Sequence, residues 1–198
     1  ECNENDFSQT ACGFVVEFVD IVETKRMNPS GTYKGIQYDN GWNVGGWPAS
    51  EMWTYANKEF FNKLPSDLQS VIKATKVVSG RGYKDKNTKR TDGNWESEDK
   101  IYLLCAHEVW ADKVMINTRE NDTAYNQTRQ LDYYKNKAVT TDSYSDAIKQ
   151  YNGSNSEWWL RAASSYIDTS FLNVRSNGNW SSNKANNSFG FAPAFRIG

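Results

Sequence analysis

Histidine and cysteine are scarce in this sequence. Its 198 residues include one histidine, His107, and three cysteines, Cys2, Cys12 and Cys105. Structural zinc sites draw their ligands mainly from these two residue types, and a nucleophile relay uses histidine as its base. The composition therefore disfavours zinc sites, haem sites and histidine-based catalysis. We predict no metal, no cofactor and no enzymatic activity.

Long apolar runs and an excess of charge of one sign are also missing. No stretch of the chain approaches the roughly 18 consecutive apolar residues that a membrane-spanning helix needs. Lys and Arg number 23 and Asp and Glu number 24, which gives a net charge of −1. Nothing in this balance points to nucleic acid or to an anionic membrane. We expect no nucleic-acid partner and no membrane insertion by this domain.

Aromatic side chains, by contrast, are abundant. They make up 14% of a chain whose mean hydropathy is −0.79, and 8 of them are tryptophan. Disordered chains lack aromatics, so this composition predicts a folded, loop-rich domain whose small core is built from large aromatic groups. Tyr, Trp, Ser and Asn are also the residues that binding surfaces favour.

The sequence pattern predicts helices in the first half of the chain. Alternation predicts a strand over 13–23, and a glycine-rich loop follows over 28–47. Pro48 opens a helix that ends at Leu64-Pro65. The other expected elements are a short helix from Ser66 or Asp67, a brief strand at Val77-Val78, a polar loop over 80–99, a central strand over 101–105, an irregular stretch over 111–127, and short helices near 128–137 and from Asp142 or Ser143 to Tyr151.

The C-terminal third predicts antiparallel strands joined by tight turns. Strands are expected at 158–161, at 171–175, from Trp180 onward and over 189–197. Asn177-Gly178 predicts a two-residue type I′ turn, since both residues accept a positive φ. Pro193 cannot donate to a ladder and marks an edge or a bulge. The class is α+β, with two helices packed on a twisted, mostly antiparallel sheet; residues 1–12 form a lead-in and 13–198 a single domain.

Several residues have more than one interpretation. Cys2 and Cys12 are close enough in sequence for a small-loop disulfide in an oxidising compartment. Cys105, inside an apolar run, is expected to be a buried free thiol, because no third group is evident to orient it with His107. Of the adjacent Trp158 and Trp159, at least one should be in the core. Arg161 and Arg196 are expected to make structural ion pairs.

Two patterns with catalytic or metal chemistry are present only in fragments. Asp92, Asn94 and Glu96 begin like a calcium loop, but Ser97 stands where glycine should turn the chain. Glu157 is the single carboxylate that we consider for glycoside hydrolysis. A solvated loop is the alternative for the first pattern, and the sequence alone does not assign a second carboxylate to pair with Glu157.

Six short motifs are spread over residues 13–198. They lie at 46–52, 64–68, 100–104, 129–134, 157–161 and 192–197. Together they resemble a family of uncharacterised domains in secreted and surface proteins of gut bacteria; the most specific part is the pair Trp-Trp-Leu-Arg and Pro-Ala-Phe-Arg-Ile. The resemblance implies an extracellular or cell-surface location. Since the chain starts at Glu1 without a signal-peptide pattern, we expect an excised domain or a processed product.

The C-terminal pattern is also similar to the C-type-lectin-like fold of formylglycine-generating-type domains and of the variable proteins of diversity-generating retroelements. In those variable proteins the C-terminal segment displays changeable side chains on a rigid scaffold, so the resemblance implies that 158–198 is a variable, ligand-binding segment. Residues 173–188 contain six Asn and four Ser, and Asn codons are rich in the adenines that the retroelements mutate. An ordinary Asn/Ser-rich surface loop is the alternative. Formylglycine-generating activity does not carry over, because no cysteine follows Cys105.

Alternation along 171–175 places Leu172 and Val174 on the core side, which leaves Phe171, Asn173 and Arg175 outward. For Phe171, partial burial is an equal alternative, and Trp180 is expected to be buried. The expected contact surface comprises Ser165, Tyr166, Asp168, Ser170, Phe171, Asn173, Arg175, Asn179, Ser181, Asn183, Asn186, Asn187 and Phe189. Its ligand would be a protein or a glycan on another cell or host surface. The first makes the domain an adhesin- or receptor-binding-type module, and the second a calcium-independent lectin-like domain.

Overall fold

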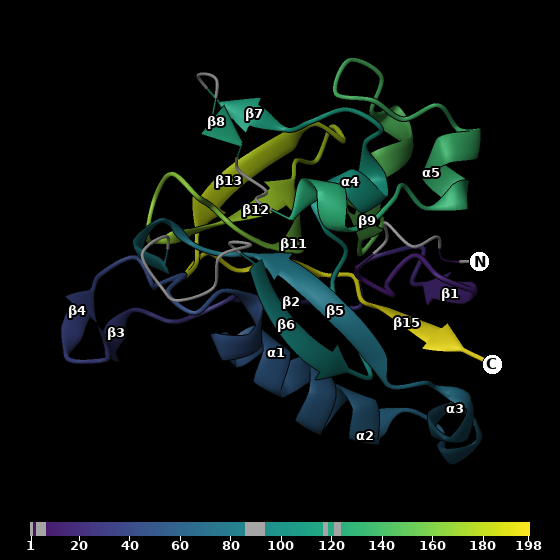
Figure 1. The fold of residues 1–198 in the computed structure, drawn as a ribbon, viewed down its shortest axis with the longest axis horizontal. Coiled ribbons are helices and arrows are strands. Elements are labelled where there is room, and N and C mark those ends of the chain that lie inside the picture. The colour runs from purple at the N-terminus through teal and green to yellow at the C-terminus, as the bar shows by residue number, and fades with distance from the viewer. Residues whose placement is uncertain (1, 3–6, 86–93, 117–118, 121–123) are drawn as a thin grey trace.

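A five-stranded sheet lies at the centre of the fold, and the chain reaches it from both ends (Figure 1). The computed structural model describes residues 2, 7–85, 94–116, 119–120 and 124–198. In the sheet the strand order is β13-β12-β11-β14-β2, and only β11 and β14 run parallel among these neighbours. The strands are β2 (Glu23–Lys25), β11 (Trp158–Ala163), β12 (Ser170–Val174), β13 (Trp180–Lys184) and β14 (Phe189–Phe191). The fold is therefore mixed α+β, as predicted.

The two ends of the domain are tied together by a second, two-stranded sheet. In it β1 (Phe14–Glu17) pairs antiparallel with β15 (Ala194–Ile197). Of the strand predicted over 13–23, β1 covers only Phe14–Glu17, and Glu23 begins β2 in the central sheet. The strand predicted over 189–197 is broken where Pro193 falls, which agrees with the missing donor of that residue.

One long helical segment lies on one side of the central sheet (Figure 1). It runs through η1 (Trp47–Ala49), α1 (Glu51–Thr54), the π-helical η2 (Tyr55–Phe60) and α2 (Phe61–Lys63), and α3 (Ser66–Val71) follows. Ser50 caps α1, because its hydroxyl accepts a hydrogen bond from the Trp53 N–H at 3.0 Å. Met52, Ala56 and Phe60 are buried on one stripe. The predicted start near Pro48 and the end at Leu64-Pro65 are confirmed.

The remaining elements are short. They are β3 (Gly31–Tyr33), β4 (Ile36–Tyr38), β5 (Thr75–Gly80), η3 (Tyr83–Asp85), β6 (Asn94–Asp99), α4 (Ala106–Val109), β7 (Met115–Ile116), β8 (Arg119–Glu120), η4 (Tyr125–Gln127), α5 (Asp132–Asn136), η5 (Ser145–Ala147), β9 (Lys149–Tyr151) and β10 (Ser154–Ser156). The predicted loops over 28–47 and 80–99 thus contain the hairpin β3–β4 and strand β6. The helix predicted from Asp142 or Ser143 to Tyr151 is reduced to the single turn of η5, because the chain then enters the hairpin β9–β10 at Lys149.

The prediction of a central strand over 101–105 is also wrong. This segment is fully buried, yet it joins a ladder only through the isolated bridge between Tyr102 and Ala194. It crosses the core as an extended chain whose carbonyls are taken by Arg161: the backbone N–H donates to Leu104 O at 2.9 Å and Nη1 donates to Leu103 O, also at 2.9 Å. A continuous apolar run indicates a segment that is buried on all sides. A central strand is one such segment, and an extended chain that crosses the core is another.

Arg161 and Glu108 form an ion pair in the centre of the core. Both side chains are 0% exposed, and Nη1 and Nη2 of Arg161 bond the two carboxylate oxygens at 2.6 and 3.0 Å. The Cys105 N–H and the hydroxyls of Thr10 and Thr128 donate to the same carboxylate. The structural ion pair predicted for Arg161 is confirmed. Arg196 instead donates to backbone and amide oxygens of the N-terminal segment.

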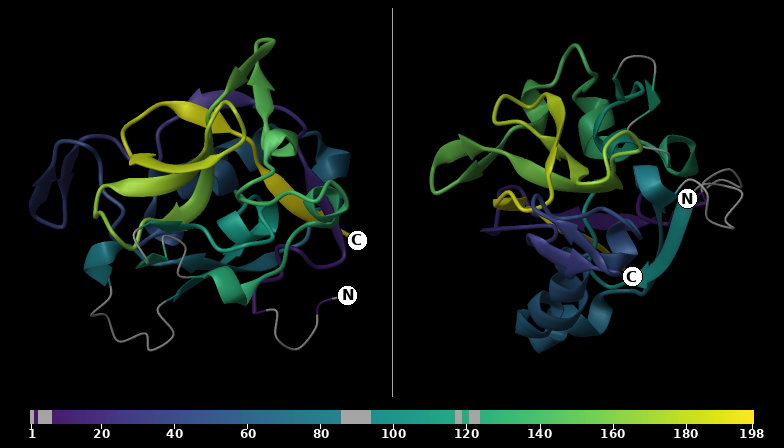
Figure 2. Two further views of the ribbon diagram at one scale, coloured as in Figure 1. Left: turned by 90° about the horizontal axis from the view of Figure 1, so that it is seen from above. Right: turned by 90° about the vertical axis from the view of Figure 1, so that its left-hand side faces the viewer.

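Both adjacent tryptophans of β11 are fully buried, on opposite faces of the sheet. Trp158 Nε1 donates to Ala147 O at 3.0 Å and Trp159 Nε1 to Lys25 O at 2.8 Å, so neither indole leaves a polar group unpaired. The prediction that at least one is in the core is confirmed. Helices α1–α3 lie on one side of the sheet, and the segment that carries α4 and α5 covers the other (Figure 2).

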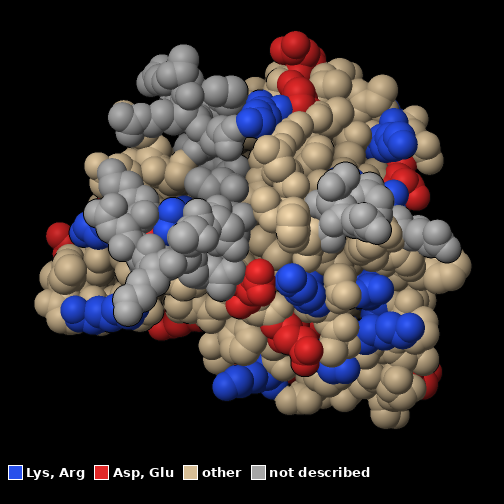
Figure 3. Space-filling view, in the orientation of Figure 1, with Lys and Arg blue, Asp and Glu red and all other residues tan. Residues whose placement is uncertain are grey.

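Acidic and basic side chains are interspersed on the described part of the face shown in Figure 3. This pattern matches the balanced composition, and the described part of this face carries no broad patch of positive or negative charge. Over the described residues, no helix has both the length and the apolar character needed to cross a bilayer.

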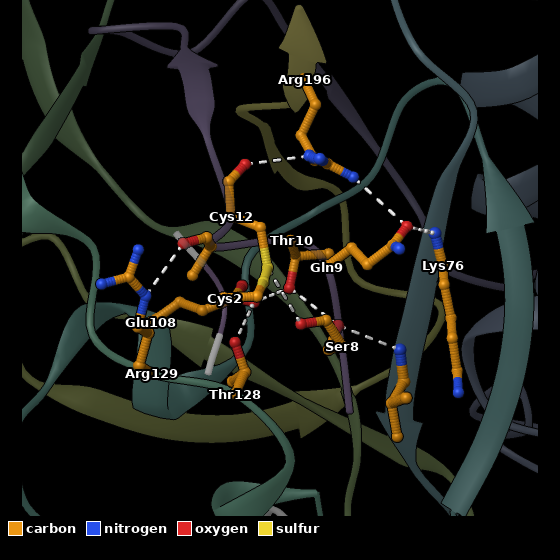
Figure 4. Close-up of a disulfide and its surroundings, with 12 residues drawn as sticks. Cys2, Ser8, Gln9, Thr10, Cys12, Lys76, Glu108, Thr128, Arg129 and Arg196 are labelled. Atoms are coloured by element: carbon orange, nitrogen blue, oxygen red, sulfur yellow. Dashed lines mark hydrogen bonds between the residues drawn. A yellow bond between two sulfur atoms is a disulfide. The ribbon is translucent and has the colours of Figure 1, made fainter. Parts of the chain in front are cut away.

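A disulfide and hydrogen bonds to the core hold the N-terminal segment in place (Figure 4). A disulfide joins Cys2 to Cys12, whereas Cys105 is buried outside any disulfide. Ser8 and Thr10 are buried as well: the Ser8 hydroxyl accepts from the Val78 N–H at 3.1 Å, and the Tyr102 hydroxyl donates to Thr10 O at 3.0 Å. Part of the segment expected as a lead-in therefore completes the polar network around Glu108.

Candidate functional site

Strand β12 is buried on both faces, which overturns the orientation expected for part of the contact surface. Phe171 and Asn173 are 0% exposed, as are Leu172 and Val174. The alternation rule assumes one open face, but β12 is an inner strand between β11 and β13 with elements packed above and below (Figure 2). Asn173 finds a partner inside, since the Asn183 amide donates to its Oδ1 at 3.0 Å.

The thirteen predicted contact residues fall into three exposure classes. Ser170, Phe171, Asn173 and Ser181 are buried; Ser165, Asp168, Asn179, Asn183, Asn186, Asn187 and Phe189 are partly buried; Tyr166 and Arg175 are exposed. The predicted outward position is wrong for the buried four. Phe189 packs its ring on Trp159, with centroids 4.8 Å apart, and so belongs mainly to the core. Trp180, expected to be buried, is partly so.

Arg175 and Asn179 lie at the turn of the β12–β13 hairpin, away from the other exposed positions. Four steps along a strand separate the two ends of β12 by about 13 Å. The Arg175 N–H donates to Asn179 O at 2.7 Å, and the Gly178 N–H to Arg175 O at 2.8 Å, so the loop has three residues and one positive φ, at Gly178. The type I′ prediction is wrong, although the hairpin itself is confirmed. Glycine is required because a Cβ would lie 2.0 Å from Tyr144 O.

The opposite end of the hairpin displays a loop over 164–169 that is held by one buried amide. Asn43 Nδ2 lies 3.1, 2.7 and 2.7 Å from the carbonyl oxygens of Ser164, Ile167 and Ser170. The Asn43 N–H also donates to Asp168 O at 2.9 Å. These bonds fix the loop and leave Tyr166 and Ile167 39% and 41% exposed. A fixed loop loses little conformational entropy when a ligand binds.

The hairpin β3–β4 places aromatic groups next to this loop. The Tyr33 ring stacks on Trp42 at 4.7 Å between centroids, and Tyr38 lies tilted against the same indole at 6.3 Å. Lys84 bridges to the loop: its Nζ is 2.6 Å from Asp168 Oδ2 and 5.1 Å from the centroid of the Tyr38 ring. The hydrogen bond to Asp168 raises the pKa of Lys84.

Asn186 joins the last segment to the same hairpin. Its side-chain amide donates to Ser30 Oγ at 3.0 Å and to Asp39 O at 3.3 Å. We call the resulting face the aromatic surface; its members are Tyr33, Lys84, Tyr166, Ile167, Asp168 and Asn186, supported from below by Tyr38 and Trp42. Three of the predicted contact residues, Tyr166, Asp168 and Asn186, come together there.

Sequence reasoning missed Tyr33, Ile167 and Lys84. The aromatic residues of the predicted 28–47 loop were an available signal, because exposed loops rarely hold so many aromatic side chains without packing them. The pairing of Lys84 with Asp168 has no local signal, since 84 positions separate the two residues.

The acidic stretch that begins like a calcium loop in the sequence forms strand β6. Asp92 lies outside the described residues, and β6 begins at Asn94. Asp99 is buried and accepts hydrogen bonds from the indoles of Trp47 and Trp53, each at 2.7 Å, and burial raises its pKa. Among the residues that the structure describes, no three His, Cys, Asp or Glu side chains are grouped to hold a metal ion. Burial also raises the pKa of Glu157, and the nearby Arg175 charge opposes that rise.

Comparison with protein families gives one match. A family with the description "Domain of unknown function (DUF6273)" matches residues 20–198. Comparisons with curated proteins and with solved structures find no match.

Proposed function

We propose a function for this chain, which belongs to the DUF6273 family: it is a non-enzymatic binding module of a secreted or surface-exposed bacterial protein, of the adhesin or receptor-binding type. The observation that carries this proposal is the aromatic surface. Exposed Tyr166 and Ile167 stand on a loop fixed by Asn43 and tied to Lys84 through Asp168. In the neighbouring hairpin, Tyr33 stacks on Trp42. Aromatic anchors beside a few polar groups dominate the energetics of recognition surfaces.

The ligand that this surface favours is a protein. Tyr166 and Ile167 are exposed apolar groups side by side, and the ion pair next to them is only partly accessible, at 42% and 27% for the Lys84 and Asp168 side chains. Exposed apolar contacts with a polar border are the usual composition of a protein–protein contact. A calcium-independent glycan site is the second candidate; the partly exposed carboxylate of Asp168, on the same loop as the exposed Tyr166 ring, favours it.

The proposal includes an extracellular location and a C-type-lectin-like fold. The Cys2–Cys12 disulfide supports an oxidising compartment. The antiparallel pairing of the chain ends and the mostly antiparallel central sheet with helices at its side support the fold.

Diversification of the C-terminal segment is part of the same proposal, restricted to the accessible positions. Buried Phe171, Asn173 and Ala185 belong to the scaffold, so variation would concentrate at 165–168, 183–184 and 186–187. Flanking DNA tests this directly. We expect a near-copy repeat that differs at adenines in those codons, beside a reverse transcriptase gene; variation spread evenly over β12 would contradict the restriction.

The double variant Tyr33→Ala/Tyr166→Ala tests the binding function. Wild type is first screened against a protein-interaction library and a glycan array, and the strongest ligand of either kind is titrated. An aromatic anchor of a recognition surface is typically worth about 2 kcal/mol, so we expect the double variant to bind at least about a hundredfold more weakly. Because Tyr33 is partly buried and stacks on Trp42, the free energy of unfolding should fall by about 0.5–1.5 kcal/mol, and the variant should stay folded. The control is Phe14→Ala, which removes an aromatic ring that is 78% exposed on β1. Equal binding by the double variant and the control would overturn the proposal.

A further inference from the structure

A second candidate site lies apart from the aromatic surface, at the end of the molecule where β1, the start of α5 and the approach to β9 meet (Figure 1). These elements enclose a pocket of about 350 Å³. Its lining includes Val15, Glu17 and Val19 from the first segment, Leu131, Asp132 and Tyr133 from the second, and Asp146, Ile148 and Lys149 from the third. The volume is sufficient for a small organic ligand.

The floor of this pocket is a hydrogen-bonded group centred on Glu17. Its Oε1 atom accepts from the Tyr134 hydroxyl at 2.7 Å and from Lys149 Nζ at 2.9 Å. Lys149 Nζ also donates to the carbonyls of Phe18 at 2.6 Å and Val19 at 3.0 Å. An ammonium group has three protons, so all three are engaged. The buried lysine therefore has no donor left for an anionic ligand.

The rim of the pocket is acidic. Asp20 accepts from the Gln150 N–H at 3.0 Å, and Asp146 lies 3.7 Å from Lys137 at the surface. Asp132, in the first turn of α5, is exposed and makes no hydrogen bond or ion pair with the described residues. Together with Glu17 the lining holds four carboxylates and two cations, Lys149 and Arg129. With Lys137, which pairs with Asp146 from outside the lining, the site has one carboxylate in excess.

Apolar and aromatic groups complete the lining. Val15, Leu131 and Ile148 offer aliphatic surface, and Tyr134 is buried beneath them. The Tyr133 ring is 55% exposed and stands edge-on to Tyr134, with centroids 5.0 Å apart. An exposed ring face beside carboxylates attracts organic cations.

We propose that this pocket binds a small organic cation, an amine carried on an apolar body. The ammonium group would lie near Asp132 and the Tyr133 ring, and the apolar body against Val15, Leu131 and Ile148. The saturated lysine disfavours an anion, and the excess of carboxylates favours a cation over a neutral molecule of the same shape. The proposal is independent of the function of the aromatic surface.

The test compares three probes that share one shape, titrated into the intact chain by calorimetry and by ligand-observed NMR. They are phenethylamine, the neutral 2-phenylethanol and the anionic 3-phenylpropionate. We expect phenethylamine to bind, more weakly as salt concentration rises, with the alcohol weaker and the anion not binding. Binding of the alcohol or the anion as tightly as the amine, or no binding of the amine at millimolar concentration, would overturn the proposal.

Variants then locate the binding. Asp132→Asn removes the open carboxylate and should weaken phenethylamine binding about fivefold, and Tyr133→Ala should weaken it about two- to fivefold through the lost ring face. Both side chains are exposed, so neither change should alter the fold. The matched control is Asp67→Asn, an exposed acid in the first turn of α3. Equal effects of Asp67→Asn and Asp132→Asn would contradict the placement. Tyr166→Ala should leave amine binding unchanged whatever its effect at the aromatic surface.

Discussion

Two ion pairs in this molecule, Arg161–Glu108 and Lys84–Asp168, lie in opposite surroundings. The Arg161–Glu108 pair is entirely enclosed, and backbone or hydroxyl groups take up the rest of its hydrogen-bonding capacity. The Lys84–Asp168 pair is partly open to solvent and stands beside the exposed Tyr166. The first pair joins three segments distant in sequence and belongs to the scaffold. The second borders a surface that can meet a ligand, so burial separates scaffold charges from contact charges in this fold.

Breaking the enclosed pair should have the largest effect on stability. Glu108→Gln keeps the shape but leaves the Arg161 charge buried without a counter-charge, which typically costs about 3–5 kcal/mol. Urea unfolding followed by tryptophan fluorescence measures the change. A loss below about 1 kcal/mol would mean that water reaches the pair and that it resembles a surface pair.

Phe171 and Tyr166 provide the same contrast between a buried scaffold side chain and an exposed contact side chain. Because it is fully buried, Phe171→Ala should lower the free energy of unfolding by about 3–5 kcal/mol. Tyr166→Ala, four residues before β12 begins at Ser170, should change it by less than about 0.5 kcal/mol. Small and equal losses of unfolding free energy for the two variants would mean that Phe171 points outward, as simple alternation predicts.

Asp99 provides a buried charge whose partners are indoles instead of a cation. Since burial raises its pKa, the folded state binds a proton at higher pH than the unfolded chain does. The contribution of this group to stability therefore rises as pH falls from neutral toward the ordinary value of about 4, and is lost as pH rises. The difference in free energy of unfolding between wild type and Asp99→Asn should shift in favour of wild type on acidification. A pH-independent difference would show that Asp99 keeps an ordinary pKa.

Opening the exposed pair should have the smallest effect on stability. Lys84→Ala and Asp168→Ala should each lower the free energy of unfolding by no more than about 1 kcal/mol, while ligand binding at the aromatic surface falls. Thermal denaturation beside a binding titration separates the two readouts. A large loss of stability with either variant would assign this pair to the scaffold as well.

Local signals in the sequence were sufficient for several elements. Pro48 and Leu64-Pro65 bound the long helical segment, and Asn177-Gly178 marks the hairpin, because proline and glycine restrict or release φ whatever the distant contacts. The burial of Trp158 and Trp159 followed from their size and apolar surface.

Long-range packing explains what the sequence could not predict. The run at 101–105 is extended without joining a sheet because Arg161 takes the carbonyls of Leu103 and Leu104, and Phe171 is buried because a second layer covers its face. The aromatic surface depends on Asn43 reaching carbonyls more than 120 positions away. None of these contacts has a local pattern, so alternation along a single strand gave the wrong orientation for part of the site.

Hydroxyl-radical footprinting read by mass spectrometry tests the central division between scaffold and contact surface most directly, because it measures side-chain accessibility in the unmodified protein. We predict rapid oxidation of Tyr166 and slow oxidation of Phe171, Trp158 and Trp159, with Tyr166 becoming protected when a ligand of the aromatic surface is bound. Oxidation of Phe171 as fast as that of Tyr166, or protection of Tyr166 in the free protein, would contradict the account.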